Sequence, residues 1–170
     1  MKVFLETQRF DQWWFKLLIL ITAAIIISSI FFALPQIENT NSFETGLIIF
    51  TCIFSLIIVI AIPFLMKLET KIDDQGIHYA FWPIHLKPRT IPWSDIKECY
   101  VRKYNPIQEY GGWGYRIKLG KKDKALNVKG NIGIQIVFKT NRRLLIGTQK
   151  ENEVQSVLNS YKYKFNKDEN

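Results

Sequence analysis

The amino-acid sequence predicts an α+β protein in which a pair of membrane-spanning helices is followed by a mainly-β domain. Two long stretches near the start of the chain contain no charged residue, and the remainder alternates short apolar runs with turn residues. The final segment has the spacing of a helix. The average composition of the 170 residues, 48% hydrophobic and 22% charged, hides this contrast between the two parts.

The chain begins with an aromatic segment, residues 1–16. Trp13 and Trp14 stand where an interfacial aromatic belt is expected, and Lys16 is placed to reach lipid headgroups. The spacing of these tryptophans and of Phe4 also allows a short amphipathic helix on the inner leaflet. We expect this segment to anchor the chain at the membrane surface, and a docking surface for the soluble domain is the alternative.

The two uncharged stretches, residues 17–34 and 45–66, are the predicted spans of a transmembrane hairpin over residues 17–66. A helix rises about 1.5 Å per residue and the hydrocarbon core is roughly 30 Å thick, so each stretch is long enough to cross a bilayer. Buried core helices seldom run so far without polar residues. The first stretch is also longer than the apolar region of a signal peptide.

The placement of basic residues predicts the orientation of the hairpin. Lys2, Arg9 and Lys16 precede the first span, whereas Lys67 and Lys71 follow the second. The connection between the spans contains no basic residue. By the positive-inside rule, both termini are expected in the cytoplasm.

The segment from 67 to 165 has the pattern of a mainly-β domain. Turn residues at 73–76 and around Asn141 predict hairpins in an antiparallel, meandering sheet of about seven strands. After Thr148, apolar residues at helical spacing and acidic residues in the first turn predict one closing helix. The expected architecture is a small barrel or orthogonal sandwich plugged at one end by the helix. The polar tail, residues 166–170, is expected to fray.

A family resemblance rests on four segments of this domain. After the two apolar stretches, the chain contains in order IPWSDI, EYGGWGYR, KALNVKGNIGIQI and LIGTQ. With these segments it resembles the small bacterial membrane proteins that carry a pleckstrin-homology-like (PH-like) domain, a group largely of unknown function. The resemblance covers most of the chain. It implies a split β-barrel capped by a C-terminal helix and a place in the bacterial inner (cytoplasmic) membrane, and it supplies no catalytic residues.

The glycine-rich stretch GGWG could be read as a phosphate-binding loop. A dinucleotide fingerprint needs its glycines between a strand and a helix, and a P-loop ends in Gly-Lys followed by Ser or Thr. Here an alternating strand follows instead, so Gly111, Gly112 and Gly114 are expected to adopt positive φ in a turn or bulge. The functional alternative is an exposed contact with a partner. The candidate residues for this contact are Tyr110, Trp113, Tyr115 and Arg116.

Positive charge indicates a second candidate contact. The net charge of the chain is +8, and the basic residues are concentrated after the second span. Each cation well placed near an anionic leaflet gains about 1 kcal/mol. The candidate lipid contacts are Trp13, Trp14, Lys16, Lys121, Lys122, Lys124 and Lys129. The alternative for the lysines is a solvated loop, and nucleic acid is not expected as a partner because the cations are dispersed along strands.

These observations favour a binding or assembly module over an enzyme. Neither histidine has a spacing that suggests a metal site, and the sequence offers no nucleophile, paired carboxylates or cofactor motif. We therefore expect a membrane-anchored module that contacts anionic lipid and engages a protein partner, or another copy of itself, at the inner membrane surface. The alternative is an oligomeric pore for ions or small solutes formed by the hairpins, although the spans contain no charged residue.

Overall fold

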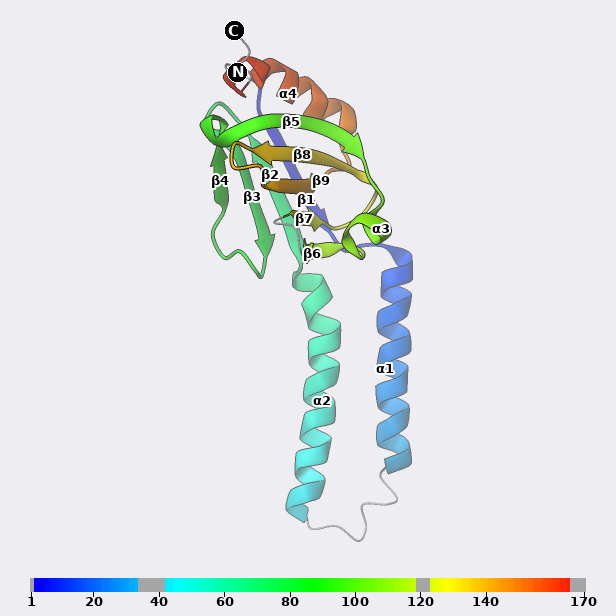
Figure 1. Cartoon of the computed structure of the whole chain (residues 1–170). Helices are drawn as coiled ribbons and strands as arrows, with labels where there is room; N and C mark the ends of the chain where they lie inside the picture. Colours follow the sequence, from blue (N-terminus) through cyan, green and yellow to red (C-terminus); the bar gives the residue numbers. More distant parts are fainter. Residues whose placement is uncertain (1, 34–41, 119–122, 166–170) are drawn as a thin grey trace. The chain divides into compact units, whose positions relative to one another are not determined.

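The computed structural model describes residues 2–33, 42–118 and 123–165 of the chain (Figure 1). The chain divides into two compact units. One is a β domain formed by Met1–Arg9 together with Met66–Asn170, and the other is a helical unit, Phe10–Leu65. The predicted polar tail and part of the basic loop lie outside the described residues.

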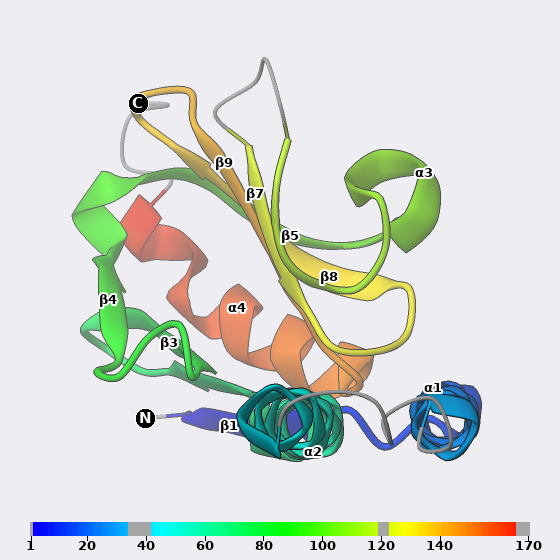
Figure 2. The same cartoon turned by 90° about the horizontal axis from the view of Figure 1, so that it is seen from below.

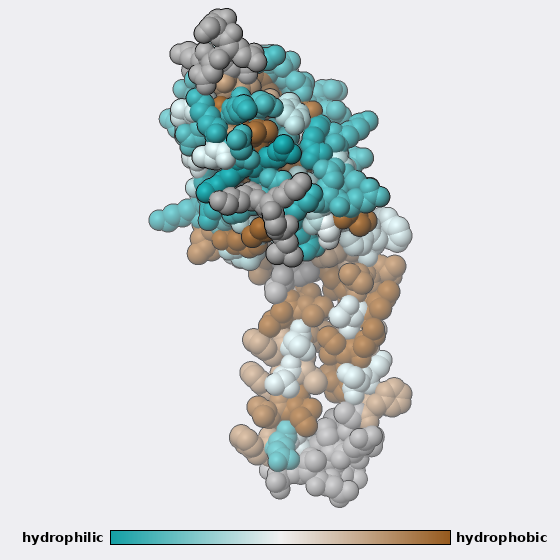
Figure 3. All heavy atoms as spheres, viewed as in Figure 1, coloured by the Kyte–Doolittle hydropathy of each residue, from teal (hydrophilic) through white to brown (hydrophobic). Residues whose placement is uncertain are grey.

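The helical unit consists of α1 (Trp13–Ala33) and α2 (Ser42–Leu65), which contact each other. Each helix contains a stretch long and apolar enough to cross a membrane, as the sequence predicts. None of the residues in these two stretches is buried, and the hydropathy colouring marks both helices as apolar (Figure 3). A core helix of a soluble domain would bury one face, and neither of these two stretches does so.

Hydroxyl groups within the two helices bond to their own backbone. Thr22 Oγ1 donates to the carbonyl of Leu18 at 2.9 Å, and Thr51 Oγ1 donates to that of Leu47 at 3.0 Å. Ser29 and Ser55 donate in the same way, each to the third residue before it. Such bonds provide a hydroxyl group with a hydrogen-bond acceptor in surroundings that contain no water.

The β domain contains two sheets and a C-terminal helix. The first sheet has the order β1-β2-β3-β4, and all of its neighbouring strands are antiparallel. Its strands are β1 (Phe4–Arg9), β2 (Lys67–Ile72), β3 (Gly76–Trp82) and β4 (Arg89–Pro92). The second sheet has the order β5-β8-β9-β7-β6. Its strands are β5 (Ile96–Lys103), β6 (Gly114–Ile117), β7 (Lys124–Asn127), β8 (Ile132–Phe138) and β9 (Arg143–Gly147).

The N-terminal segment differs from the amphipathic helix that its aromatic spacing allows. Residues Phe4–Arg9 form strand β1, which pairs along its whole length with β2. The alternating pattern of buried and exposed side chains, with Phe4 fully buried, matches a strand with one face on a core. Arg9 lies opposite Lys67, so the chain leaves and re-enters the domain at adjacent positions of one sheet.

The second sheet differs from the expected antiparallel meander in two pairings, β5 with β8 and β7 with β9. Strand β7 runs parallel to β9. The chain leaves β7 and enters β8, which pairs with β5 and β9 and not with β7, so β9 is inserted between them. The two predicted hairpins are confirmed, β2–β3 and β8–β9, the latter turning through Asn141 at φ 58°. The two sheets do not form a closed barrel.

The C-terminal helix α4 (Glu151–Phe165) closes the core, as predicted, by packing against β5, β1 and the short 3-10 helix η2 (Trp93–Asp95). Trp93 stacks on Tyr161 and Phe165 of α4, with ring centroids 5.3 and 5.5 Å apart. Burying side chains of this size stabilises a fold by about 1.5–3 kcal/mol each. Figure 2 shows α4 on one side of the second sheet.

Polar side chains of β1 attach the N-terminus to the connection before α4. Glu6, which is buried, accepts hydrogen bonds from Thr148 Oγ1 at 2.6 Å and from the backbone N–H of Gln149 at 2.8 Å. Gln8 Nε2 donates to the carbonyl of Gly147 at 2.7 Å. The first strand and the last helix therefore depend on each other, although they lie at opposite ends of the sequence.

Candidate functional site

The outer face of the second sheet is covered by a short helix, α3 (Pro106–Tyr110). Beneath it lie three buried side chains, Tyr104, Ala125 and Leu145. Tyr110 packs against this cluster, with its ring 6.1 Å from that of Tyr104 in an edge-to-face arrangement. Figure 2 shows α3 and α4 on opposite sides of the second sheet.

The start of α3 is fixed by its capping residues. Asn105 Oδ1 accepts hydrogen bonds from the backbone N–H groups of Ile107 at 3.1 Å and Gln108 at 3.0 Å. Pro106 occupies the first helical position, where its missing N–H costs nothing. Glu109 reaches back and accepts from the N–H of Asn105 at 2.9 Å. These reciprocal bonds explain why so short a segment is helical.

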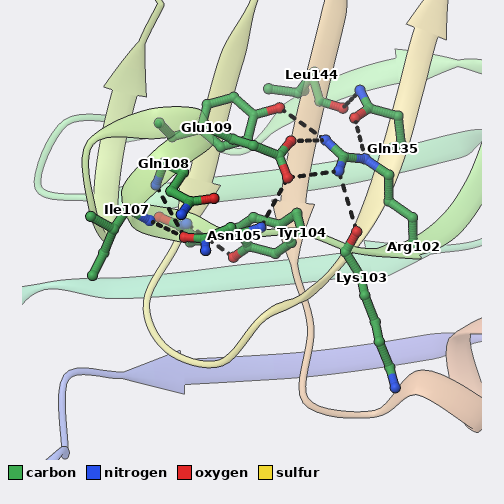
Figure 4. A network of polar contacts seen from close by, with 11 residues as sticks. Arg102, Lys103, Tyr104, Asn105, Ile107, Gln108, Glu109, Gln135 and Leu144 are labelled. Atoms are coloured by element: carbon green, nitrogen blue, oxygen red, sulfur yellow. Dashed lines mark hydrogen bonds and ion pairs between the residues drawn. The ribbon is translucent and has the colours of Figure 1, made fainter.

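A bidentate ion pair ties α3 to β5 (Figure 4). Arg102 Nη2 lies 2.8 Å from Glu109 Oε2, and Nη1 donates to Oε1 at 3.2 Å. Arg102 Nε donates to Gln135 Oε1 at 3.0 Å, which links the pair to β8. The hydrogen bonds from Arg102 lower the pKa of Glu109, and those to Glu109 raise the pKa of Arg102. The two strands and α3 therefore hold one another in place.

The glycines that follow α3 adopt the conformations that the sequence predicts. Gly111 caps the helix in the left-handed region at φ 72°, and Gly112 and Gly114 both have φ 118°. Gly114 N–H donates to Asn127 Oδ1 at 2.9 Å, and Asn127 Nδ2 donates to the hydroxyl oxygen of Tyr104 at 2.9 Å. Burial raises the pKa of Tyr104 to about 12, so this hydroxyl stays protonated. The GGWG loop is thus bonded, through Asn127, to the buried cluster beneath α3.

The four residues of the predicted partner contact separate into two groups. Trp113 is half-buried and its Nε1 donates to the carbonyl of Gly130 at 3.0 Å. Arg116 is exposed and its Nε donates to the carbonyl of Trp113 at 3.0 Å, so these two lie together at the surface. Tyr115 instead points between the sheets, where its ring lies 5.7 Å from that of His85. Tyr110 belongs to the cluster beneath α3.

A shallow hollow of about 440 Å³ lies beside Trp113. Its wall includes Ile107 of α3, whose side chain is 64% exposed. An exposed apolar residue next to an indole fixed by a hydrogen bond is a feature of contact surfaces. The sequence singles out Trp113 but gives no sign of Ile107, because the position of α3 depends on the ion pair with Arg102.

The predicted lipid contacts belong to both compact units of the chain. Lys124 is exposed at the start of β7, whereas Lys129 lies in the connection after β7, where its carbonyl accepts from Gln149. Trp13, Trp14 and Lys16 belong to the first turns of α1, and Trp13 is 75% exposed. Lys121 and Lys122 lie outside the described residues.

A separate polar cluster surrounds Asp73 at the turn between β2 and β3. Its carboxylate lies 3.0 Å from His78 Nε2 and 2.8 Å from Lys71 Nζ, and it accepts from the N–H of Gln75 at 2.9 Å. Burial favours the neutral acid, but these hydrogen bonds outweigh burial and lower the pKa of Asp73 far below its usual range. The carboxylate closes the turn, as its position in the sequence predicts.

Metal binding has no candidate site among the residues that the structure describes. Within 2–33, 42–118 and 123–165, no three His, Cys, Asp or Glu side chains lie close enough together to hold an ion. Comparison of the chain with protein-family models, with curated proteins and with solved structures finds no match. The site is therefore interpreted from its own geometry.

The ion pair between Arg102 and Glu109 should stabilise the domain. A double-mutant cycle of Arg102→Met and Glu109→Gln should give a coupling energy of about 1 kcal/mol at neutral pH, because both side chains are partly exposed and solvent weakens their attraction. Since the pKa of Glu109 is lowered in the folded state, this contribution is complete above the ordinary glutamate pKa of 4.5 and is lost as the pH falls below it.

Urea unfolding of the purified full-length chain, followed by tryptophan fluorescence at several pH values, measures this coupling. Lys97→Met is the control, since Lys97 is exposed on β5 and belongs to no ion pair among the described residues. A coupling energy that is zero at neutral pH, or that is unchanged in acid, would show that the pair does not hold α3 in place.

Proposed function

We propose that the chain is a membrane-anchored, non-enzymatic binding or assembly module. In this proposal the hairpin α1–α2 spans the inner membrane of a bacterium and the PH-like domain lies on the cytoplasmic side. The domain contacts anionic lipid and engages a protein partner, or another copy of itself, through the surface that contains Trp113 and Arg116. The observation that carries the proposal is the rigid presentation of Trp113 by α3 and the glycine loop.

The pairing of β1 with β2 supports the hairpin topology. Arg9 and Lys67 lie opposite each other in one sheet, and the helical unit connects them. Two residues that pair in one sheet must lie on the same side of a bilayer, so the chain between them has to cross an even number of times. Two apolar helices with no buried residue in their spans satisfy this requirement.

The PH-like assignment rests on the resemblance of the sequence and on the order of the elements. Two sheets, of four and five strands, precede a C-terminal helix that closes the core between them. The closing C-terminal helix supports the proposal, whereas the open edges and the parallel pair β7–β9 depart from the split barrel that the resemblance implies. A fold does not determine its ligand, so the function is argued from the surface itself.

A rigid surface around Trp113 suits recognition of another protein. Tryptophan and arginine are the side chains most often found at the energetic centre of protein interfaces. Because the glycine loop is already held by bonds to Gly130 and Asn127, little conformational entropy is lost when a partner binds. The adjacent strand β6 is an edge of the second sheet and offers a backbone for strand addition.

The proposed topology predicts which side chains an impermeant reagent can reach. In a chain with Cys52→Ser and Cys99→Ser, Glu44→Cys at the start of α2 should react with an impermeant maleimide on intact spheroplasts. Lys162→Cys on α4 should react only after lysis, because the positive-inside rule places the β domain in the cytoplasm. Labelling of Lys162→Cys without lysis would show that the orientation is the reverse of the one proposed.

The proposed contact predicts that Trp113→Ala loses a specific cross-linked partner. The full-length chain is cross-linked in native membranes, purified and analysed by mass spectrometry. Trp82→Ala is the control, since it removes the same half-buried side chain from β3, outside the proposed contact. Loss of one heterologous protein in Trp113→Ala alone supports an adaptor, and loss of self-cross-links supports a homo-oligomer. Identical cross-links in all three chains would refute the contact.

A further inference from the structure

A second hollow of the β domain, of about 520 Å³, lies away from the α3 site. Residues from both sheets line it, with Tyr79 of β3 and Leu144 of β9 among them. The rest of the lining comes from η2, from the start of β7, and from the end of β8, the turn after it and the start of β9. These residues are Ser94, Asp95, Lys124, Phe138, Lys139, Thr140, Arg142 and Arg143.

The lining of this hollow is strongly basic. Four of its residues are cations, whereas Asp95 is the only carboxylate that lines it. Among the residues that the structure describes, no carboxylate forms an ion pair with Lys124, Arg142 or Arg143. Three cations that line one hollow without an ion pair among the described residues repel one another, and an anion bound between them would relieve this repulsion.

The cations are carried on a rigid frame. The turn between β8 and β9 is closed by two backbone hydrogen bonds, from Phe138 N–H to the carbonyl of Arg142 at 2.9 Å and from Asn141 N–H to that of Phe138 at 2.8 Å. Lys124 pairs with Leu144, the residue that follows Arg143, in the parallel pair β7–β9. The unexpected parallel pairing is thus what places Lys124 beside the two arginines.

The positive potential of the cations around the hollow extends to residues between the sheets. Burial lowers the pKa of His85, and the charges of Arg89 and Lys124 lower it further. Burial likewise raises the pKa of Tyr79, an effect that the neighbouring Arg89 opposes. Of these two cations, Lys124 lines the hollow, so the charge of the hollow reaches the buried His85.

We propose that this hollow binds a phosphate group, either the headgroup of an anionic lipid or a small soluble phosphate ester. The guanidinium groups of Arg142 and Arg143 can each donate two parallel hydrogen bonds to a phosphate, and Lys124 adds a point charge. The hydroxyl group of Thr140 is a further donor in the lining. The volume is within the usual range of small-molecule sites.

This inference uses Lys124 from the predicted lipid contact but does not depend on the partner contact at Trp113. The two surfaces share no residue. Loss of a cross-linked partner in Trp113→Ala and loss of phosphate binding in a variant of the hollow are therefore separate outcomes, and either proposal can fail while the other stands.

The test is a titration of the full-length chain in detergent with inorganic phosphate, followed through the NMR amide signals of residues 138–144. Sodium chloride at matched ionic strength is the reference. Phosphate should shift these signals with saturation. Lys124→Gln with Arg143→Gln should weaken binding by at least about tenfold, on the basis of roughly fivefold for each cation removed. Asp95→Asn should tighten it, because the substitution removes the carboxylate of the hollow.

The control is Lys97→Gln with Lys162→Gln, which removes two exposed cations from β5 and α4 and changes the net charge equally. The control variant should bind phosphate as the wild type does. Two results would overturn the proposal. One is equal weakening of phosphate binding in the control variant. The other is the absence of saturating shifts at residues 138–144 in both the phosphate titration and the lipid experiment below. Unchanged amide signals elsewhere show that the variants remain folded.

The source of the phosphate group is distinguished in nanodiscs. Discs of phosphatidylcholine alone are compared with discs that also contain phosphatidic acid. If phosphatidic acid shifts the signals of residues 138–144 and competes with inorganic phosphate, the ligand is a lipid headgroup. If inorganic phosphate binds equally well in both discs, the ligand is a soluble phosphate ester.

Discussion

The pairing of β1 with β2 is the interaction on which the rest of the structure depends. The helical unit interrupts the β domain between these two neighbouring strands, so the domain is complete only when residues 4–9 return to the edge of the first sheet. Glu6 and Gln8 then satisfy donor and acceptor groups of the segment that leads into α4. Without β1, the first sheet would lose its edge strand and the core would lose the side chain of Phe4. The segment that leads into α4 would lose its hydrogen bonds to Glu6 and Gln8.

The same domain carries two surfaces of different chemistry on one frame. The α3 site is built on the outer face of the second sheet and presents an indole beside apolar surface, which suits a protein. The basic hollow is built from the β8–β9 turn and the parallel strand β7, and it suits an anion. Both surfaces include strands of the second sheet, so one frame holds them in a fixed relation.

Local patterns in the sequence predict the elements that local chemistry determines. The two apolar helices, the turns at Asp73 and Asn141, the positive φ of the GGWG glycines and the closing helix are confirmed, because each depends on residues within a few positions of one another. Strand β1 is missed because its partner lies some sixty residues away and its aromatic residues also fit a helix. The parallel pair β7–β9 is missed because only a short connection separates β7 from β8, and such a connection normally indicates that the two strands form a hairpin. At the site, Trp113 and Lys124 are singled out by composition, whereas Arg102 and Arg143 gain their roles only through long-range pairing.

The most direct test of this account is a disulfide between β1 and β2 in native membranes. Thr7 and Glu69 lie directly opposite each other on the outward face, so Thr7→Cys with Glu69→Cys in a chain lacking Cys52 and Cys99 should form an intramolecular disulfide on mild oxidation. Leu5→Cys with Glu69→Cys, which is out of register, should form it poorly. Efficient closure of the first pair alone would establish that the β domain is assembled across the helical hairpin. Failure of the first pair to close, or closure only between two copies of the chain, would contradict it.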